Sequence, residues 1–300
     1  MGKIIKISEA MQTRIEGMKS GTILTPNGDT YKERTIYSWK GVEKWVNQYE
    51  VDTKKVLTSN NIAEFSTYLI RQGLSKNSIA YYTANINTML PVGKKLKTYG
   101  EITTAVYSLE EELKLLRDLK GLSASMEILR DMYLIQSYTG LRVSDLLKLL
   151  VNIEQYLKLI EGKYYFVLKS QKTRQDVVIP LNKIVVSILK KRKFRFEKIF
   201  STWYYSKSIK KIAKYAGFNE KVIFYRTEKG KLVEKTFEKW QLMSTHTARR
   251  SFATNAYLSG VPTLVIMRIT GHSTEHSFMR YIRANSLVNA LAAGNYLFFR

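Results

Sequence analysis

The sequence predicts a mainly helical (α+β) protein of two domains, and three observations lead to this prediction. Apolar residues recur at spacings of three and four along most of the 300-residue chain, which is typical of amphipathic helices. The clearest β-rich runs lie in the second part of the chain. Residues 91–100, between the two parts, are rich in Gly, Pro and Lys, as exposed linkers are. We therefore expect one domain over residues 1–100 and another over residues 101–300.

The first part is expected to be a small bundle of helices. Between the first two helices, the Asn27-Gly28 pair suits a tight reversal with positive φ, so a loop or short hairpin is predicted there. The periodic segments that predict the helices are Ile7–Met18, Thr35–Tyr49, Ile62–Gln72 and Lys76–Leu90.

The second part is expected to combine further helices with short strands. Ser108-Leu-Glu-Glu111 has the pattern of a capping box, which predicts that a helix begins there. Tyr164–Ser170 and Asp176–Pro180 are rich in β-branched and aromatic residues, and a polar, basic segment separates them, so they predict a strand pair. A second pair is predicted at Val222–Tyr225 and Lys231–Lys235.

The charge of the chain indicates an anionic partner. Lys and Arg number 49 against 25 Asp and Glu, which gives a formal net charge of +24. Both parts of the chain share this excess, and two basic domains joined by a short linker could grip opposite sides of a duplex. Double-stranded nucleic acid is therefore the predicted partner.

The composition also excludes several kinds of chemistry. The chain has no cysteine, which rules out disulfides, thiolate zinc sites and cysteine nucleophiles, and fits a reducing, intracellular compartment. No run approaches the ~20 consecutive apolar residues of a membrane span, and the N-terminus is too charged for a secretory signal. We expect a cytoplasmic protein with no membrane partner.

All three histidines lie near the C-terminus, at His246, His272 and His276. Ser244–Thr254 predicts a helix on which His246 and Arg249 share one face. Taken alone, such a pair is more typical of a solvated helix face than of a functional site.

His272-Ser-Thr-Glu-His276 also matches H-x-x-E-H, the pattern of one group of zinc metallopeptidases. A zinc site of this kind needs a third protein ligand. Residues 277–300 contain no Asp, Glu or His, so that ligand would have to come from upstream. The zinc hypothesis is therefore the weaker one, and sensitivity to chelators would support it.

Two further segments have simple structural interpretations. Gly140 permits a turn, and Arg142 after it opens a predicted helix, which by itself describes a helix start with a surface arginine. Tyr281 shares a face with Phe278 if a helix begins near Ser273, which by itself describes a packed aromatic residue.

The joint order of these residues changes that interpretation. The motifs T-G-L-R, H-x-x-R and G-H followed by Tyr resemble those of the tyrosine recombinase (phage-type integrase) family, and the resemblance covers nearly the whole chain. Residues 245–254 and 271–282 look most like integrases of mobile elements in Bacteroidetes. The residues that carry the resemblance, in chain order, are Arg142, Lys172, His246, Arg249, His272 and Tyr281.

The resemblance implies a fold and a mechanism. It implies a helical, SAM-like core-binding domain over residues 1–100 and a catalytic domain with the DNA breaking-rejoining fold over residues 101–300. It implies that Tyr281 attacks the scissile phosphate and forms a 3′-phosphotyrosyl bond. Arg142 and Arg249, which are planar and permanently charged, would clamp the phosphate oxygens.

The remaining roles also follow from the resemblance. Lys172 would protonate the leaving 5′-hydroxyl, with Arg174 as the competing candidate. His246 would hydrogen-bond the phosphate or help to accept the tyrosine proton. His272 would support the same oxygens, and His276 receives no role. No cofactor and no metal ion are expected.

The resemblance further implies an assembly and leaves alternatives open. The apolar tail Ser286–Phe299 would dock onto a neighbouring protomer and link four subunits on DNA, the alternative being that it packs on its own domain. A type IB topoisomerase-like enzyme is one alternative function. The other is a catalytically silent DNA-binding or architectural protein.

Overall fold

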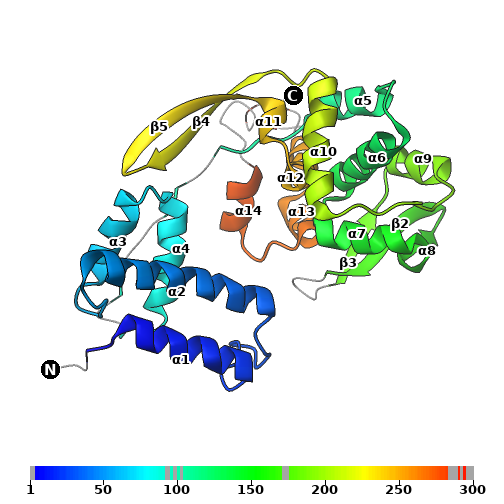
Figure 1. The fold of residues 1–300 in the computed structure, drawn as a ribbon. Coiled ribbons are helices and arrows are strands. Elements are labelled where there is room, and N and C mark those ends of the chain that lie inside the picture. Colours follow the sequence, from blue (N-terminus) through cyan, green and yellow to red (C-terminus); the bar gives the residue numbers. More distant parts are fainter. Residues whose placement is uncertain are drawn as a thin grey trace. The chain divides into compact units, whose positions relative to one another are not determined.

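The computed structural model describes residues 4–91, 95–96, 100–101, 104–170, 176–282, 290 and 293–294. Over these residues the chain is mainly helical with two small sheets, which confirms the predicted fold class. The chain divides into two compact units (Figure 1). The N-terminal unit contains residues 1–104 and 223–235, and the C-terminal unit contains residues 105–222 and 236–300. No helix in the described ranges has the length and apolar character to cross a membrane.

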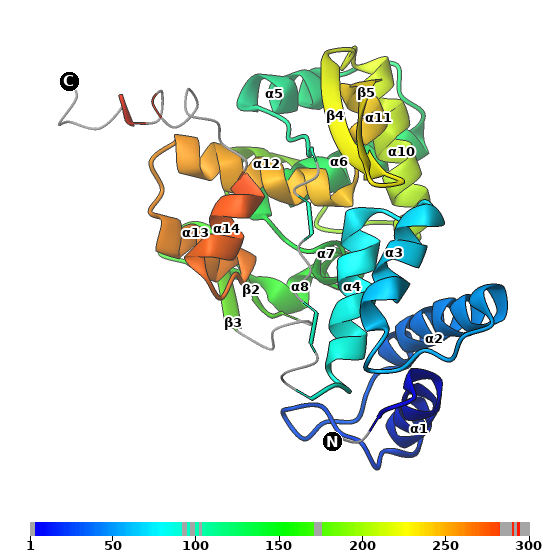
Figure 2. The ribbon, with the colours of Figure 1, turned by 90° about the vertical axis from the view of Figure 1, so that its left-hand side faces the viewer.

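Four helices pack around the core of the N-terminal unit. In α1 the buried residues Ile7, Met11, Ile15 and Met18 follow the spacing of one helix face and pack along α2. Helix α3 packs against α4, as Figure 2 shows. The bounds are α1 (Ile7–Ser20), α2 (Glu33–Thr53), α3 (Ile62–Arg71) and α4 (Lys76–Asn87), close to the four predicted segments.

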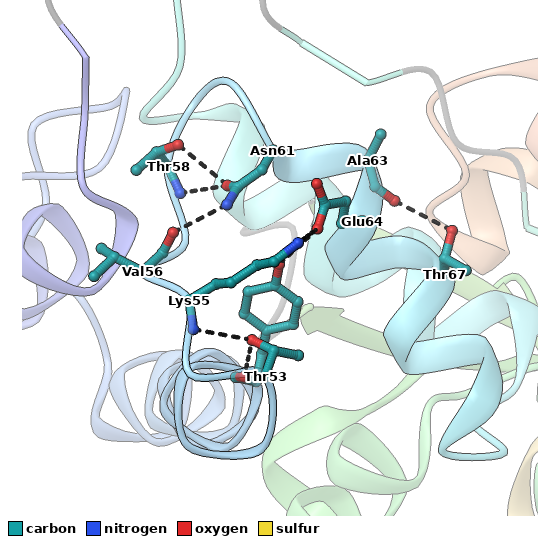
Figure 3. Close-up of polar contacts among 9 residues, drawn as sticks. Thr53, Lys55, Val56, Thr58, Asn61, Ala63, Glu64 and Thr67 are labelled. Carbon is teal, nitrogen blue, oxygen red and sulfur yellow. Dashed lines mark hydrogen bonds and ion pairs between the residues drawn. The ribbon is translucent and has the colours of Figure 1, made fainter.

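Side chains close the loops of this unit. Gly28 adopts the expected positive φ, at 79°, in the reversal between α1 and α2. Between α2 and α3 the amide of Asn61 accepts hydrogen bonds from the backbone N–H and the hydroxyl of Thr58 and donates one to the carbonyl of Val56 (Figure 3). These three hydrogen bonds hold the loop.

A long hairpin, β4 (Lys221–Glu228) and β5 (Lys231–Glu238), is shared between the units. Its middle belongs to the N-terminal unit because the N–H and hydroxyl of Thr227 both donate to the carboxylate of Glu101. Sequence periodicity predicted the two strands but made them too short. The predicted division after residue 100 did not place residues 223–235 with the N-terminal unit.

The C-terminal unit is built around α6. This helix is buried along almost its whole length, with α5, α9, α10 and α12 packed against it. The helices are α5 (Glu110–Asp118), α6 (Ala124–Thr139), α7 (Val143–Val151), α8 (Ile153–Tyr156), α9 (Lys183–Lys191), α10 (Thr202–Tyr215), α11 (Lys239–Leu242), α12 (Thr245–Leu258), α13 (Thr263–Thr270) and α14 (Glu275–Ile282).

An antiparallel sheet of order β1-β2-β3 lies beside these helices. Its strands are β1 (Leu157–Ile160), β2 (Lys163–Lys169) and β3 (Asp176–Pro180). Phe166 and Ile179 pair across β2 and β3 and are both fully buried. Strand β1 was not predicted, because it has four residues and most of them are exposed.

The start of α5 differs from the predicted capping box by one residue. Helix α5 begins at Glu110, and the carboxylate of Glu112 accepts a hydrogen bond from the N–H of Leu109 at 2.8 Å. Ser108 is buried instead. Its N–H donates to the hydroxyl of Ser251 at 2.7 Å, and its own hydroxyl lies 2.9 Å from that of Tyr133.

Candidate active site

The turn between α6 and α7 positions the first arginine of the candidate site. Gly140 ends α6 in the left-handed region, with φ of 67°, and a Cβ at this position would collide with the ring of Phe252. Arg142 then stands at the N-cap of α7. Both features agree with the sequence-based expectation.

Arg142 is held from two other segments of the C-terminal unit. Its guanidinium donates to the hydroxyl of Ser170, just after β2, at 3.1 Å and to the carbonyl of Gly271, just after α13, at 3.2 Å. These bonds fix the orientation of a side chain that remains half-buried.

Arg249 is the buried member of the pair. It lies on α12, is 4% exposed, and donates a hydrogen bond to the carbonyl of Gly140. Burial lowers its pKa to about 10; the Tyr281 phenol raises this pKa, the Arg142 charge lowers it, and Asp145 raises it. Arg249 nevertheless stays cationic at neutral pH. Asp145 is therefore a buried acid that acts on Arg249.

Helix α14 brings Tyr281 to these arginines. Phe278 and Ile282 of α14 are buried against α12 and α13, and this packing sets the face of the helix on which Tyr281 lies. The Tyr281 hydroxyl donates to the backbone carbonyl of His246 over a long 3.4 Å. The guanidinium carbon of Arg250 lies 5.5 Å from the centroid of the Tyr281 ring.

Opposing effects act on the acidity of Tyr281. Burial raises the pKa of the phenol, whereas the charges of Arg249, Arg250 and Arg142 and a hydrogen bond with Arg249 lower it. The three arginines thus stabilise the phenolate form, which is the nucleophilic form of a tyrosine.

His272 completes the cluster. Its ring centroid lies 5.0 Å from that of Tyr281, and its Nδ1 lies 2.8 Å from the hydroxyl of Thr270. Burial, together with the charges of Arg249 and Arg142, lowers the pKa of His272 to about 4. The imidazole is therefore neutral at neutral pH.

The structure thus brings together four of the six predicted side chains: Arg142, Arg249, His272 and Tyr281. His246 contributes its backbone carbonyl, and its side chain is exposed. Lys172 lies outside the described residues, with its competitor Arg174. The predicted tail Ser286–Phe299 also lies outside the described residues, apart from residues 290 and 293–294.

Two residues of the site were missed by the sequence reasoning. Arg250 received no predicted role, yet its guanidinium lies over the ring of Tyr281. Thr270 had no predicted role and holds His272. The adjacent Arg249-Arg250 pair was a visible signal for the first, whereas no pattern in the sequence marks the second.

The arrangement suits a tetrahedral anion. Two guanidinium groups converge near a phenol and a neutral imidazole, and planar guanidinium forks match the paired oxygens of a phosphate. Among the residues that the structure describes, no group of three or more His, Asp or Glu is placed to hold a metal ion. This includes the His272-to-His276 segment that matches the zinc pattern.

Comparisons with known proteins agree on one family. The sequence model of the phage integrase family matches residues 108–287, more than half of the chain. A tyrosine recombinase, XerA of Pyrococcus horikoshii, is 24% identical over 283 residues, covering 78% of this chain and 93% of the relative.

Two solved structures share the fold. A Tn1549 transposon integrase in complex with transposon right end DNA has a TM-score of 0.62 at 15% identity, covering 98% of this chain and 100% of the other. The XerH site-specific recombinase bound to a palindromic difH substrate, a post-cleavage complex, has a TM-score of 0.61 at 16% identity, covering 96% and 84%. The chain therefore belongs to the phage integrase family and is a tyrosine recombinase, an enzyme that recombines DNA at specific sites.

Proposed function

We propose that the chain breaks and rejoins double-stranded DNA through a covalent bond between Tyr281 and the 3′-phosphate. The observation that carries this proposal is the convergence of Arg142 and Arg249 on the phenol of Tyr281. A phosphodiester bound by the two guanidinium groups would present its phosphorus to that phenol.

The reaction is a transesterification. The Tyr281 oxygen forms a bond to phosphorus as the bond from phosphorus to the 5′-oxygen breaks, and the arginines offset the negative charge that builds on the phosphate oxygens. The phosphotyrosyl bond conserves the energy of the broken one. Attack by a 5′-hydroxyl of a second strand then rejoins the DNA, and no step needs ATP or a metal ion.

Other residues would supply the proton transfers and contacts. Lys172 would protonate the leaving 5′-oxygen. The His246 side chain, which is exposed at the start of α12, would contact a phosphate oxygen of bound DNA. His272, whose ring centroid lies 5.0 Å from that of Tyr281, would act beside the nucleophile.

DNA is the proposed substrate on two grounds. The solved XerH and Tn1549 proteins are described as DNA complexes. On the N-terminal unit, α2 and α4 also present a hollow whose lining includes the polar Asn77 and Ser78 and two exposed tyrosines, Tyr37 (77%) and Tyr81 (45%). Such donors and rings suit the edges of bases and the sugar-phosphate backbone.

The assembly is part of this proposal. Four protomers, linked by the tail Ser286–Phe299 docking onto a neighbour, would exchange two strands at a time through a Holliday junction. In a bacterial cell they would act in the cytoplasm, on nucleoid DNA. The closer likeness to Bacteroidetes integrases stays a prediction.

A nicked duplex tests the nucleophile. The duplex carries one of the repeats that flank the gene in its genome, so that cleavage releases a short fragment and traps the covalent complex. The wild-type protein is expected to give a denaturation-resistant DNA adduct that mass spectrometry places on Tyr281, and Tyr281→Phe is expected to bind without forming it.

A matched variant controls for the loss of a phenol. Tyr257→Phe removes a half-buried tyrosine hydroxyl from α12, outside the site, and is expected to form the adduct at the wild-type rate. Wild-type binding with no adduct would point to a silent DNA-binding protein. Relaxation of supercoiled DNA without a specific site would point to a topoisomerase.

A further inference from the structure

The hydroxyl of Thr270 has one hydrogen and two close polar neighbours. Thr270 is fully buried at the end of α13. Its Oγ1 lies 2.7 Å from the carbonyl oxygen of Ile266 and 2.8 Å from Nδ1 of His272. A carbonyl oxygen only accepts, so the 2.7 Å contact with Ile266 is a hydrogen bond only when the hydroxyl hydrogen is donated to that carbonyl.

This bond determines the tautomer of His272. Because the Thr270 hydroxyl has already donated its hydrogen, its oxygen can only accept from Nδ1, and Nδ1 must carry a hydrogen. Burial and the charges of Arg249 and Arg142 lower the pKa of His272 to about 4, so the ring carries no second hydrogen at neutral pH. Nε2 is then a hydrogen-bond acceptor with a lone pair.

The ring of His272 lies beside the ring of Tyr281. The two rings are 5.0 Å apart between centroids. The acceptor that the structure gives the Tyr281 hydroxyl, the His246 carbonyl, lies at 3.4 Å, which is long for an O–H donor. A carbonyl also cannot take up a proton at neutral pH, whereas an imidazole nitrogen can.

We propose that Thr270 is a positioning residue that holds His272 as the Nδ1–H tautomer, and that Nε2 of His272 receives the proton of Tyr281 during DNA cleavage. The proton transfer from Tyr281 to Nε2 rests on the function proposed above. In this proposal His272 accepts a proton from the nucleophile Tyr281. A role in supporting the phosphate oxygens would instead require Nε2 to carry a hydrogen.

The step balances in protons and bonds. The proton passes from the Tyr281 oxygen to Nε2 as that oxygen bonds to phosphorus, the bond to the 5′-oxygen breaks, and the leaving oxygen takes a proton from a separate acid, Lys172 in the mechanism above. Among the residues that the structure describes, Arg249 and Arg142 are the charged groups that act on the pKa of His272. An anionic phosphate bound between them offsets both charges and raises the basicity of the imidazole when the proton must move.

The tautomer can be measured directly in the free protein. The chain has three histidines, so two-dimensional long-range ¹⁵N–¹H spectra of histidine-labelled protein contain few signals, and His272→Gln identifies those of His272. We expect one protonated nitrogen at Nδ1 and one unprotonated nitrogen at Nε2 at neutral pH. A hydrogen on Nε2 would overturn the assignment, whatever the outcome of the DNA experiments.

Cleavage rates test the role of Thr270. Thr270→Val keeps the shape of the side chain but removes the acceptor for Nδ1–H, so single-turnover cleavage of the nicked duplex is expected to fall about tenfold or more, within the usual contribution of general base catalysis. Thr270→Ser keeps the hydroxyl and is expected to retain most of the rate. DNA affinity is expected to stay unchanged in both.

Thr53→Val is the matched control. Thr53, the last residue of α2, also donates to the carbonyl four residues before it, at 2.7 Å, but it lies in the N-terminal unit, outside the candidate active site. We expect it to cleave at the wild-type rate with the wild-type ¹⁵N pattern. An unchanged or faster rate in Thr270→Val would overturn the role of Thr270, whereas absence of a Tyr281 adduct in the wild-type protein would instead refute the proposed function.

Discussion

The guanidinium of Arg249 donates a hydrogen bond to the carbonyl of Gly140, two residues before Arg142. The second arginine of the site therefore holds the turn that carries the first. Gln136 also holds this turn, because its side-chain amide donates a hydrogen bond to the carbonyl of Leu141 at 3.0 Å. The same amide accepts a hydrogen bond from the buried hydroxyl of Tyr205 at 3.0 Å. The turn before Arg142 is thus fixed by side chains from α6 and α12.

Gly140→Ala is expected to destabilise the protein through two effects. The left-handed φ costs about 1 kcal/mol for a residue with a Cβ, and the collision with Phe252 adds about 1–3 kcal/mol. Gly217→Ala is the control, because Gly217 has φ of 82° with open space around a Cβ. Urea unfolding measures both, and equal losses would contradict a steric role for Phe252.

Gln136→Leu is expected to impair both stability and cleavage. The substitution leaves the Leu141 carbonyl and the Tyr205 hydroxyl buried without partners, at a cost of about 1–3 kcal/mol for each unpaired group. Tyr205→Phe removes only the hydrogen bond from the Tyr205 hydroxyl to Gln136, and it is expected to lower the free energy of unfolding by about 1 kcal/mol. If cleavage by folded Gln136→Leu protein equals that of Tyr205→Phe, the bond to Leu141 does not position Arg142.

Arg249→Lys is expected to lower the cleavage rate by about 10²–10³ with little change in DNA affinity. Lysine keeps the charge but cannot bind the Gly140 carbonyl and a phosphate oxygen through one planar fork. Single-turnover cleavage and gel-shift titration measure the two quantities. A parallel loss of affinity and rate would show that Arg249 acts in binding alone.

The lowered pKa of His272 predicts a pH dependence of stability. The pKa is about 4 in the folded chain and 6.5 in the unfolded chain, so the unfolded state binds this proton first as the pH falls. The free energy of unfolding is therefore expected to be unaffected by His272 above pH 6.5 and to fall as the pH drops from about 6.5 to about 4. In His272→Gln this loss should be smaller, and an identical pH profile would contradict the lowered pKa.

Local patterns predicted much of the fold. Apolar spacing predicted α1 to α4 within a few residues, because burial on one helix face leaves a period that the sequence records. The order of Arg142, His246, Arg249, His272 and Tyr281 indicated the family, which the comparison over residues 108–287 confirms. The role of Lys172 stays a prediction.

Other features depend on contacts that leave no period in the sequence. The bond from Thr227 to Glu101 spans 126 residues, and that from Arg249 to Gly140 spans 109. Thr270 looks like any threonine near a helix end until its neighbours are known. The sequence by itself thus predicted the N-terminal helices, the strand pairs and the candidate site residues, since these follow from local spacing and residue chemistry. Only the tertiary structure decided which carbonyl each arginine binds and which hydroxyl lies against the His272 ring, because hydrogen-bond partners are set by where segments meet in space.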